Sequence, residues 1–255
     1  MPSLRLLVPV LFALALCGMP PAASAQSFSD SQRGDIETIV RNYLLAHPEV
    51  LEEAMAELSK RQTAADTEKH EASIAKNAET IFNSPRGVTV GNKDGDVTFV
   101  EFFDYNCGYC KRAMADMLDL MKSDPKLKVV LKEFPVLGPG SVEAAQVAVA
   151  ARMQDPAGKK YLDFHQKLLG GRGQADKAHA MAAAKEAGFD VAKLEKDISS
   201  PEVRATLEEN FKLAEDMGMN GTPSYVIGKQ IVVGAVGLDG LKEKIGLARC
   251  GKATC

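Results

Sequence analysis

The chain has 255 residues, of which 45% are apolar and 25% charged, with a formal net charge of −3 at neutral pH. These proportions are those of an ordinary globular protein, so collagen-like, low-complexity and wholly disordered architectures are excluded. Lysine and arginine form no dense block, and the chain therefore lacks the electrostatic footprint of a protein that binds nucleic acid or an anionic membrane surface.

The first 25 residues have the pattern of an export signal. Arg5 supplies a positive charge, residues 6–16 form an apolar run, and residues 23–25 (Ala-Ser-Ala) match a small-residue cleavage site. The run is too short to span a bilayer. Cys17 could instead carry a lipid anchor, but a leucine precedes it where such a motif has a small residue. We expect residues 1–25 to be a signal peptide and the mature chain not to insert into the membrane.

Residues 26–84 are predicted to form a helical arm, with helix over 30–82. Pro48 divides the arm into two helices, because the residue before a proline disfavours helical backbone and proline is tolerated at a helix start. A seven-residue recurrence of Leu and Ala gives a weak coiled-coil signal. Two interpretations remain open: an amphipathic arm folded onto its own domain, or a stalk through which copies of the chain oligomerise. The apolar stripe on the first helix consists of Ile36, Ile39, Val40, Tyr43 and Leu44.

From residue 87 the pattern changes to that of an α/β domain. Residues 87–90 are predicted as a short strand, 92–95 as the turn of a hairpin, and 97–103 as a strand buried on both faces. A helix is expected over 109–122 and a strand over 127–134.

An alanine-rich block follows over residues 141–217, and its internal Gly and Pro breaks predict about four helices. After it, residues 225–227 and 231–233 are predicted as an antiparallel pair of strands, and 238–247 as a last helix. This order of elements favours an α/β fold around a mixed sheet.

Two cysteines, Cys107 and Cys110, directly follow the buried strand. A Cys-x-x-Cys pair at the start of a helix is a redox arrangement, because the unpaired N–H groups and the helix dipole stabilise a thiolate at the first cysteine. Two intervening residues place the second cysteine one turn on, close enough to resolve a mixed disulfide. We interpret Cys107 as the exposed nucleophile and Cys110 as the more buried resolving thiol.

Zinc and structural alternatives are less well supported. A zinc site needs a second pair of ligands, whereas the four histidines form no close pair and the spacing of Cys250 and Cys255 is unusual for that purpose. A purely structural disulfide across so short a loop would constrain little of the unfolded chain.

Three features carry a resemblance to a known family. The strand ending in Glu101-Phe102-Phe103, the Cys-Gly-Tyr-Cys motif and residues 221–224 (Gly-Thr-Pro-Ser) are similar to those of the DsbA-type thioredoxin-fold proteins of the bacterial envelope. Within them, the helical extension and the motif resemble the suppressor-of-copper-sensitivity protein C (ScsC) group. The resemblance implies a periplasmic protein with a thioredoxin fold over 85–140 and 218–249, and an inserted helical domain over 141–217.

The resemblance also implies roles for individual residues. Pro223 would be a cis-proline that faces the active site and leaves the backbone of Thr222 free to pair with a substrate strand; with Tyr109, these are the candidate substrate-binding residues. Glu101 would be a buried acid that exchanges protons with Cys110, since burial raises the pKa of a lone carboxylate. An ordinary turn at Pro223 and a solvent-reaching Glu101 are the alternatives.

The two residues between the cysteines bear on redox strength. Strongly oxidising DsbA-like proteins have a histidine there, whereas Gly108 and Tyr109 are as in envelope isomerases. We expect a Cys107 pKa below the ~8.5 of a free thiol but less depressed than the ~3.5 of DsbA. The leading hypothesis is an oligomeric disulfide isomerase that acts on unfolded or wrongly disulfide-bonded envelope proteins and is kept reduced by a membrane thiol reductant. A monomeric dithiol oxidase is the alternative.

The same sulfurs suggest a metal. Two thiolates suit Cu(I), and the family resemblance points the same way, so Cu(I) binding by Cys107 and Cys110 is a further hypothesis; no cofactor is otherwise required. Cys250 and Cys255, in the C-terminal tail 250–255, are predicted to form a structural disulfide. An auxiliary redox pair is the alternative for them.

Overall fold

The computed structural model describes residues 28–255, so the predicted signal peptide lies outside the described residues. The chain divides after Ser59 into two units, rather than at residue 84 where the sequence predicted a boundary. The first unit contains α1 (Asp30–Ala46) and the beginning of α2 (Glu49–Phe82). Over the described residues, no helix combines the length and apolarity that crossing a membrane requires.

Helix α1 starts with a reciprocal cap. The Ser29 side chain accepts a hydrogen bond from the Gln32 backbone N–H, and the Gln32 side chain accepts one from the Ser29 N–H. The prediction of two helices interrupted at His47-Pro48 is confirmed. No residue of α1 is buried, and the apolar stripe includes Ile39, which is 67% exposed.

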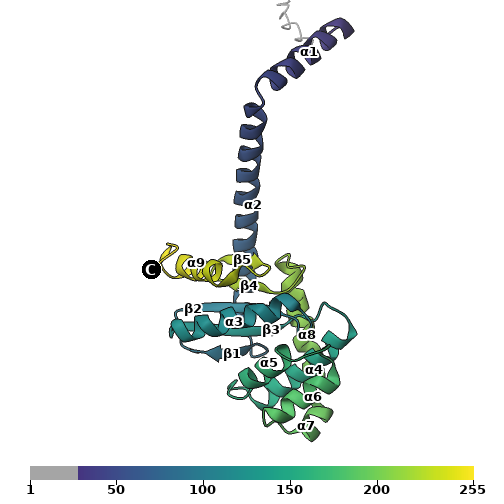
Figure 1. Ribbon diagram of the computed structural model, residues 1–255, viewed down its shortest axis with the longest axis vertical. Helices are drawn as coiled ribbons and strands as arrows, with labels where there is room; N and C mark the ends of the chain where they lie inside the picture. Colours follow the sequence, from purple (N-terminus) through teal and green to yellow (C-terminus); the bar gives the residue numbers. More distant parts are fainter. Residues whose placement is uncertain (1–27) are drawn as a thin grey trace, which may run out of the picture. The chain divides into compact units, whose positions relative to one another are not determined.

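The second unit is organised around a five-stranded sheet of order β1-β3-β2-β4-β5 (Figure 1). Strands β2 and β3 are parallel, and the other neighbours are antiparallel. Strand β2 is buried on both faces of the sheet, which is why its sequence is almost continuously apolar. The strands are β1 (Val88–Gly91), β2 (Val97–Phe103), β3 (Leu127–Glu133), β4 (Ser224–Ile227) and β5 (Gln230–Val233).

Two apolar cores cover the two faces of this sheet. Helices α3 (Gly108–Ser123) and α9 (Gly237–Cys250) belong to the larger core, together with the inserted helices. The smaller core packs the end of α2, through Ile74 and Ile81, against the opposite face. The final part of the predicted arm is therefore built into the second unit.

The predicted hairpin at residues 92–95 is wrong. A turn is present, but β3 lies between β1 and β2, and β1 pairs with β3. The turn crosses the start of β3: the Asp96 N–H donates to the Lys126 carbonyl at 2.9 Å. A Cβ atom on Gly95 would lie 2.4 Å from the backbone nitrogen of Lys128, so the crossing requires glycine.

The insertion contains five helices between residues 139 and 216, all of them within the described residues, where the sequence predicted about four. The Gly and Pro breaks, at residues 155–156, 170–173, 188 and 200–201, each separate two of these helices. The first of the five helices carries buried alanines, and these small side chains let its neighbours pack closely against it. The helices are α4 (Pro139–Gln154), α5 (Tyr161–Leu169), α6 (Lys177–Glu186), α7 (Val191–Asp197) and α8 (Pro201–Asp216).

Candidate active site

Cys107 lies where β2 gives way to α3. It is the N-cap residue of the helix, with extended backbone, and its sulfur accepts a hydrogen bond from the Cys110 N–H at 3.4 Å. A sulfur in this position faces the unpaired N–H groups and the positive end of the helix dipole. The Cys107 sulfur therefore caps the first turn of α3.

The loop before β4 lies against the same sulfur. The Cys107 thiol donates to the Thr222 carbonyl oxygen at 3.1 Å, and the Thr222–Pro223 peptide bond is cis. The structure thus brings Cys107, Thr222 and Pro223 together, although they are separated by more than a hundred residues.

The exposure of the two cysteines differs from the prediction in one respect. Cys107 is 5% exposed and Cys110 is fully buried, so Cys107 is the more accessible thiol but not an exposed one. The reason is the Thr222 loop, whose carbonyl contacts its sulfur. Tyr109, by contrast, is 60% exposed, and the Arg112 guanidinium lies 4.5 Å from the centre of its ring.

Glu101 lies in the middle of β2 and is buried. Burial, and secondarily the negative charge of Asp116, raises its pKa to about 8. Burial also raises the pKa of the Cys110 thiol, and the nearby Glu101 carboxylate adds to that effect. Glu101, with a pKa of about 8, therefore lies near enough to the buried Cys110 thiol for its charge to raise the pKa of that thiol.

Sequence reasoning missed Tyr225, which is the cross-strand partner of Glu101 on β4. Its hydroxyl is buried and has no hydrogen-bond partner among the described residues. Burial, and the charges of Glu101 and Cys110, raise the Tyr225 pKa. Only the pairing register reveals this neighbour, since the residue reads in sequence as an ordinary strand aromatic.

Asp104 was also missed, although it organises the loop before Cys107. Its buried carboxylate accepts hydrogen bonds from the backbone N–H groups of Asn106, Val136 and Leu137 and from the Ser141 hydroxyl. Two carboxylate oxygens thereby hold the active-site loop against the start of α4. The only sequence signal was a polar residue directly after an apolar strand.

A third group connects the sheet to the insertion. The Tyr161 hydroxyl donates to Glu133 at 2.7 Å, and the Tyr105 hydroxyl lies 3.4 Å from the His165 ring nitrogen. Burial raises the pKa of Glu133 and lowers that of His165 to about 3. These side chains are buried and bond to one another, so we assign the group to packing.

Two further cysteines lie at the C-terminal end of the chain. Cys250 and Cys255 form a disulfide that closes the tail after α9, whereas Cys107 and Cys110 are free. Across residues 28–255, no three or more His, Cys, Asp or Glu side chains gather as a metal site would need.

A Cys-x-x-Cys pair at the start of a helix, opposite a cis-proline on a thioredoxin-type sheet, defines a thiol-disulfide oxidoreductase. Residues 98–246 match the model of the DSBA-like thioredoxin domain, and the chain belongs to this family. Residues 32–65 match the model of the copper resistance protein ScsC N-terminal domain. The predicted fold and family resemblance are confirmed.

Similar proteins agree with this assignment. A thioredoxin-like oxidoreductase from Silicibacter pomeroyi is 43% identical, with a TM-score of 0.63 over 67% of this chain and 96% of that chain. A linker-deletion mutant of ScsC from Proteus mirabilis is 28% identical, with a TM-score of 0.65 over 88% of this chain and 98% of that chain. The chain is also 28% identical over 140 residues to the Na(+)/H(+) antiporter NhaA of Herminiimonas arsenicoxydans, and this match covers 54% of the chain but only 21% of the antiporter's length.

Proposed function

We propose that the chain is a periplasmic disulfide isomerase that works as an oligomer. The observation that carries this proposal is the position of the Cys107 sulfur, held between the start of α3 and the carbonyl of Thr222. A client strand that paired with the Thr222 backbone would displace this contact and present its disulfide to the sulfur.

The chemistry begins when the Cys107 thiolate attacks one sulfur of a client disulfide. A mixed disulfide forms, the client bond breaks, and the second client sulfur leaves as a thiolate. In isomerisation, another client thiolate then attacks the mixed disulfide, which forms a new client disulfide and regenerates Cys107 without net oxidation.

Release without rearrangement uses Cys110. Glu101 accepts the Cys110 proton, the Cys110 thiolate attacks the Cys107 sulfur, and the client leaves reduced by two electrons while a Cys107–Cys110 disulfide forms. An external dithiol, for which we propose a membrane thiol reductant, must then reduce that disulfide and be oxidised itself.

The exposed stripe of α1 supports the oligomer. Apolar side chains at helical spacing have no buried member within one chain, and pairing such stripes removes apolar surface from water. Several active sites in one assembly would hold a misfolded client by multivalent contact, which isomerisation needs.

The test compares two reactions of the mature chain. Recovery of activity from scrambled ribonuclease, faster than oxidation of a reduced peptide and accompanied by an oligomeric mass in light scattering, would support the proposal. Peptide oxidation by a monomer with no recovery would establish the dithiol-oxidase alternative. Cys107→Ser should be inactive in both assays.

Copper handling is a second candidate, supported by the match of residues 32–65 to the ScsC N-terminal domain and by two free thiols of a kind that Cu(I) prefers. Cys107 and Cys110 would hold the ion as cargo, in competition with clients. Competition for Cu(I) with a chelator should show affinity that Cys107→Ser abolishes; equal affinity of the variant would remove this site from copper binding.

A further inference from the structure

Three cations border the Cys107–Cys110 motif, and none of them has a carboxylate partner among the residues the structure describes. The Lys111 ammonium donates to the Gly171 carbonyl oxygen at 3.0 Å, and the Arg112 guanidinium lies over the Tyr109 ring. Arg172 is exposed and forms no ion pair within residues 28–255. We call Lys111, Arg112 and Arg172 the basic rim.

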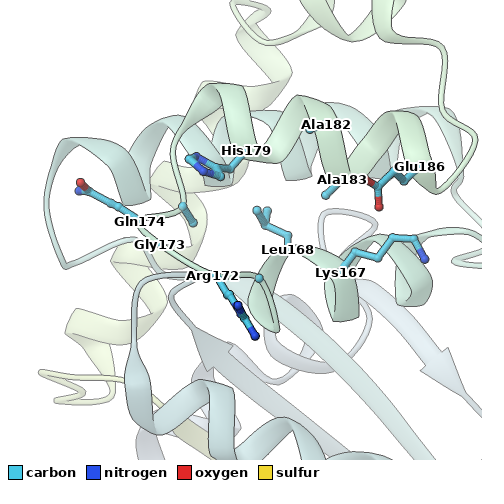
Figure 2. A pocket seen from close by; sticks show the side chains of 11 residues that line it. Lys167, Leu168, Arg172, Gly173, Gln174, His179, Ala182, Ala183 and Glu186 are labelled. Atoms are coloured by element: carbon cyan, nitrogen blue, oxygen red, sulfur yellow. The ribbon is translucent and has the colours of Figure 1, made fainter.

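The loop that carries Arg172 is fixed to the active site. The Asn106 amide donates to the Ala175 carbonyl at 2.8 Å, and the Ala175 N–H donates to the Asn106 side-chain oxygen at 2.7 Å. With the Lys111–Gly171 contact, these bonds hold both ends of the loop against the residues around Cys107. Figure 2 shows the Arg172 side chain leaving the loop on the side away from His179 and α6. Arg172 also borders a pocket of about 180 Å³.

Two lysines of the neighbouring insertion are paired with carboxylates. Lys167 pairs with Asp163 at 2.7 Å, and Lys177 pairs with Glu195 at 2.6 Å. The chain as a whole is acidic, with a net charge of −3. The basic rim places three positive charges on or beside the motif, against the acidic balance of the chain, and an acidic partner would complement them.

We infer that the basic rim recruits protein segments that carry Asp or Glu beside their reactive cysteine. This inference rests on the proposed function and adds the class of client. The carboxylates of the segment would lie against Arg112 and Arg172 while its backbone lies along Thr222. The exposed Tyr109 ring, held by Arg112, would supply apolar contact, since Tyr and Arg are the residues most often found at interface hot spots.

The test uses the reduced full chain and two disulfide-bonded peptides that differ only in two Asp residues beside the disulfide, replaced by Asn in the second. We expect the acidic peptide to form the mixed disulfide about tenfold faster at low salt, with the preference lost at about 1 M salt. Arg172→Gln should reduce this preference and Arg172→Glu should abolish it, whereas Arg172→Lys should retain it. Lys193→Glu, on α7, is the matched control and should keep the preference of the wild type.

Alkylation of Cys107 by uncharged iodoacetamide separates recognition from thiol activation. An unchanged alkylation rate in Arg172→Glu, with a changed peptide preference, would support the inference. A parallel fall in alkylation and in both peptide rates would overturn it, because the rim would then act on the sulfur alone. Equal rates with both peptides in the wild type would also overturn it while leaving the proposed function intact; no reaction with either peptide would contradict the proposed function itself.

Discussion

At the scale of single residues, the fold keeps one carboxyl group out of water beside a thiol. The pKa of Glu101 is raised from 4.5 to about 8, so the folded chain retains a proton that the unfolded chain releases near pH 4.5. Since the folded state then binds more protons, the free energy of unfolding falls as pH rises between these two values.

Replacing Glu101 with Gln should therefore stabilise the reduced protein at high pH only. One pKa unit corresponds to 1.36 kcal/mol, which predicts a gain on the order of 4 kcal/mol at pH 8.5 and little change at pH 4. Urea unfolding of wild type and variant at the two pH values measures this difference. Glu52→Gln, on an exposed position of α2, is the control, and the same gain at both pH values would contradict the assignment.

The two cysteines should also be distinguishable by trapping. Cys110→Ser leaves Cys107 able to attack but removes the buried thiol that releases the client, so mixed disulfides should accumulate. Cys107→Ser should form none. Non-reducing electrophoresis after incubation with scrambled ribonuclease measures the adducts. Equal amounts of adduct from the two variants would contradict the assignment of Cys107 as the attacking thiol and Cys110 as the releasing thiol.

At the scale of elements, α2 serves two environments along its length. Met55 is 71% exposed, whereas Ile81 is fully buried in the smaller core. We expect Ile81→Ala to lower the free energy of unfolding by about 2–5 kcal/mol, because it removes buried methyl groups and leaves a cavity. Met55→Ala is the matched control in the same helix and should have little effect on urea unfolding; similar losses for the two would contradict this division of the helix.

Helix α1 makes a separate prediction through its exposed stripe. Ile39→Asp places a charge in the surface that we propose to be paired between copies, and should weaken self-association at least tenfold, since burying an isoleucine contributes about 1.5–3 kcal/mol. Thr38→Asp adds the same charge on the opposite face of the helix, about 200° around from Ile36 of the stripe. This control should leave the mass of the oligomer unchanged. Light scattering measures both, and a monomeric wild type would remove the oligomer from the proposal.

At the scale of the whole molecule, the local patterns of the site could be predicted from sequence and its long-range contacts could not. Cys107 and Cys110 follow from a short motif, whereas the cis-proline and the buried Glu101 were implied by the family resemblance. The turn at residues 92–95 was recognised, but a turn signal does not say which strand edges pair, and β3 takes the place between its two flanking strands.

Buried polar side chains show the same limit. Asp104 bonds to backbone groups more than thirty residues away, and no spacing rule connects these positions. The Lys132 ammonium is buried with Glu209 at 3.7 Å, and burial lowers its pKa to about 8. In sequence this lysine lies in a strand and gives no sign of facing a helix that begins almost seventy residues later.

The limits of the catalytic unit supply the last prediction. A chain starting at Lys60 keeps Ile74 and Ile81, and should fold and oxidise a reduced peptide at the rate of the mature chain, but should lose recovery of scrambled ribonuclease with the α1 stripe. A chain starting at Asn83 also loses both isoleucines and the hydrogen bond from Ser73 to the Asp216 carbonyl. Its free energy of unfolding, measured in urea, should be lower than that of the chain from Lys60 by at least roughly 4 kcal/mol. Equal stability of the two truncated chains would show that the end of α2 does not belong to the catalytic domain, and retained isomerase activity in the chain from Lys60 would show that isomerisation does not depend on the first unit.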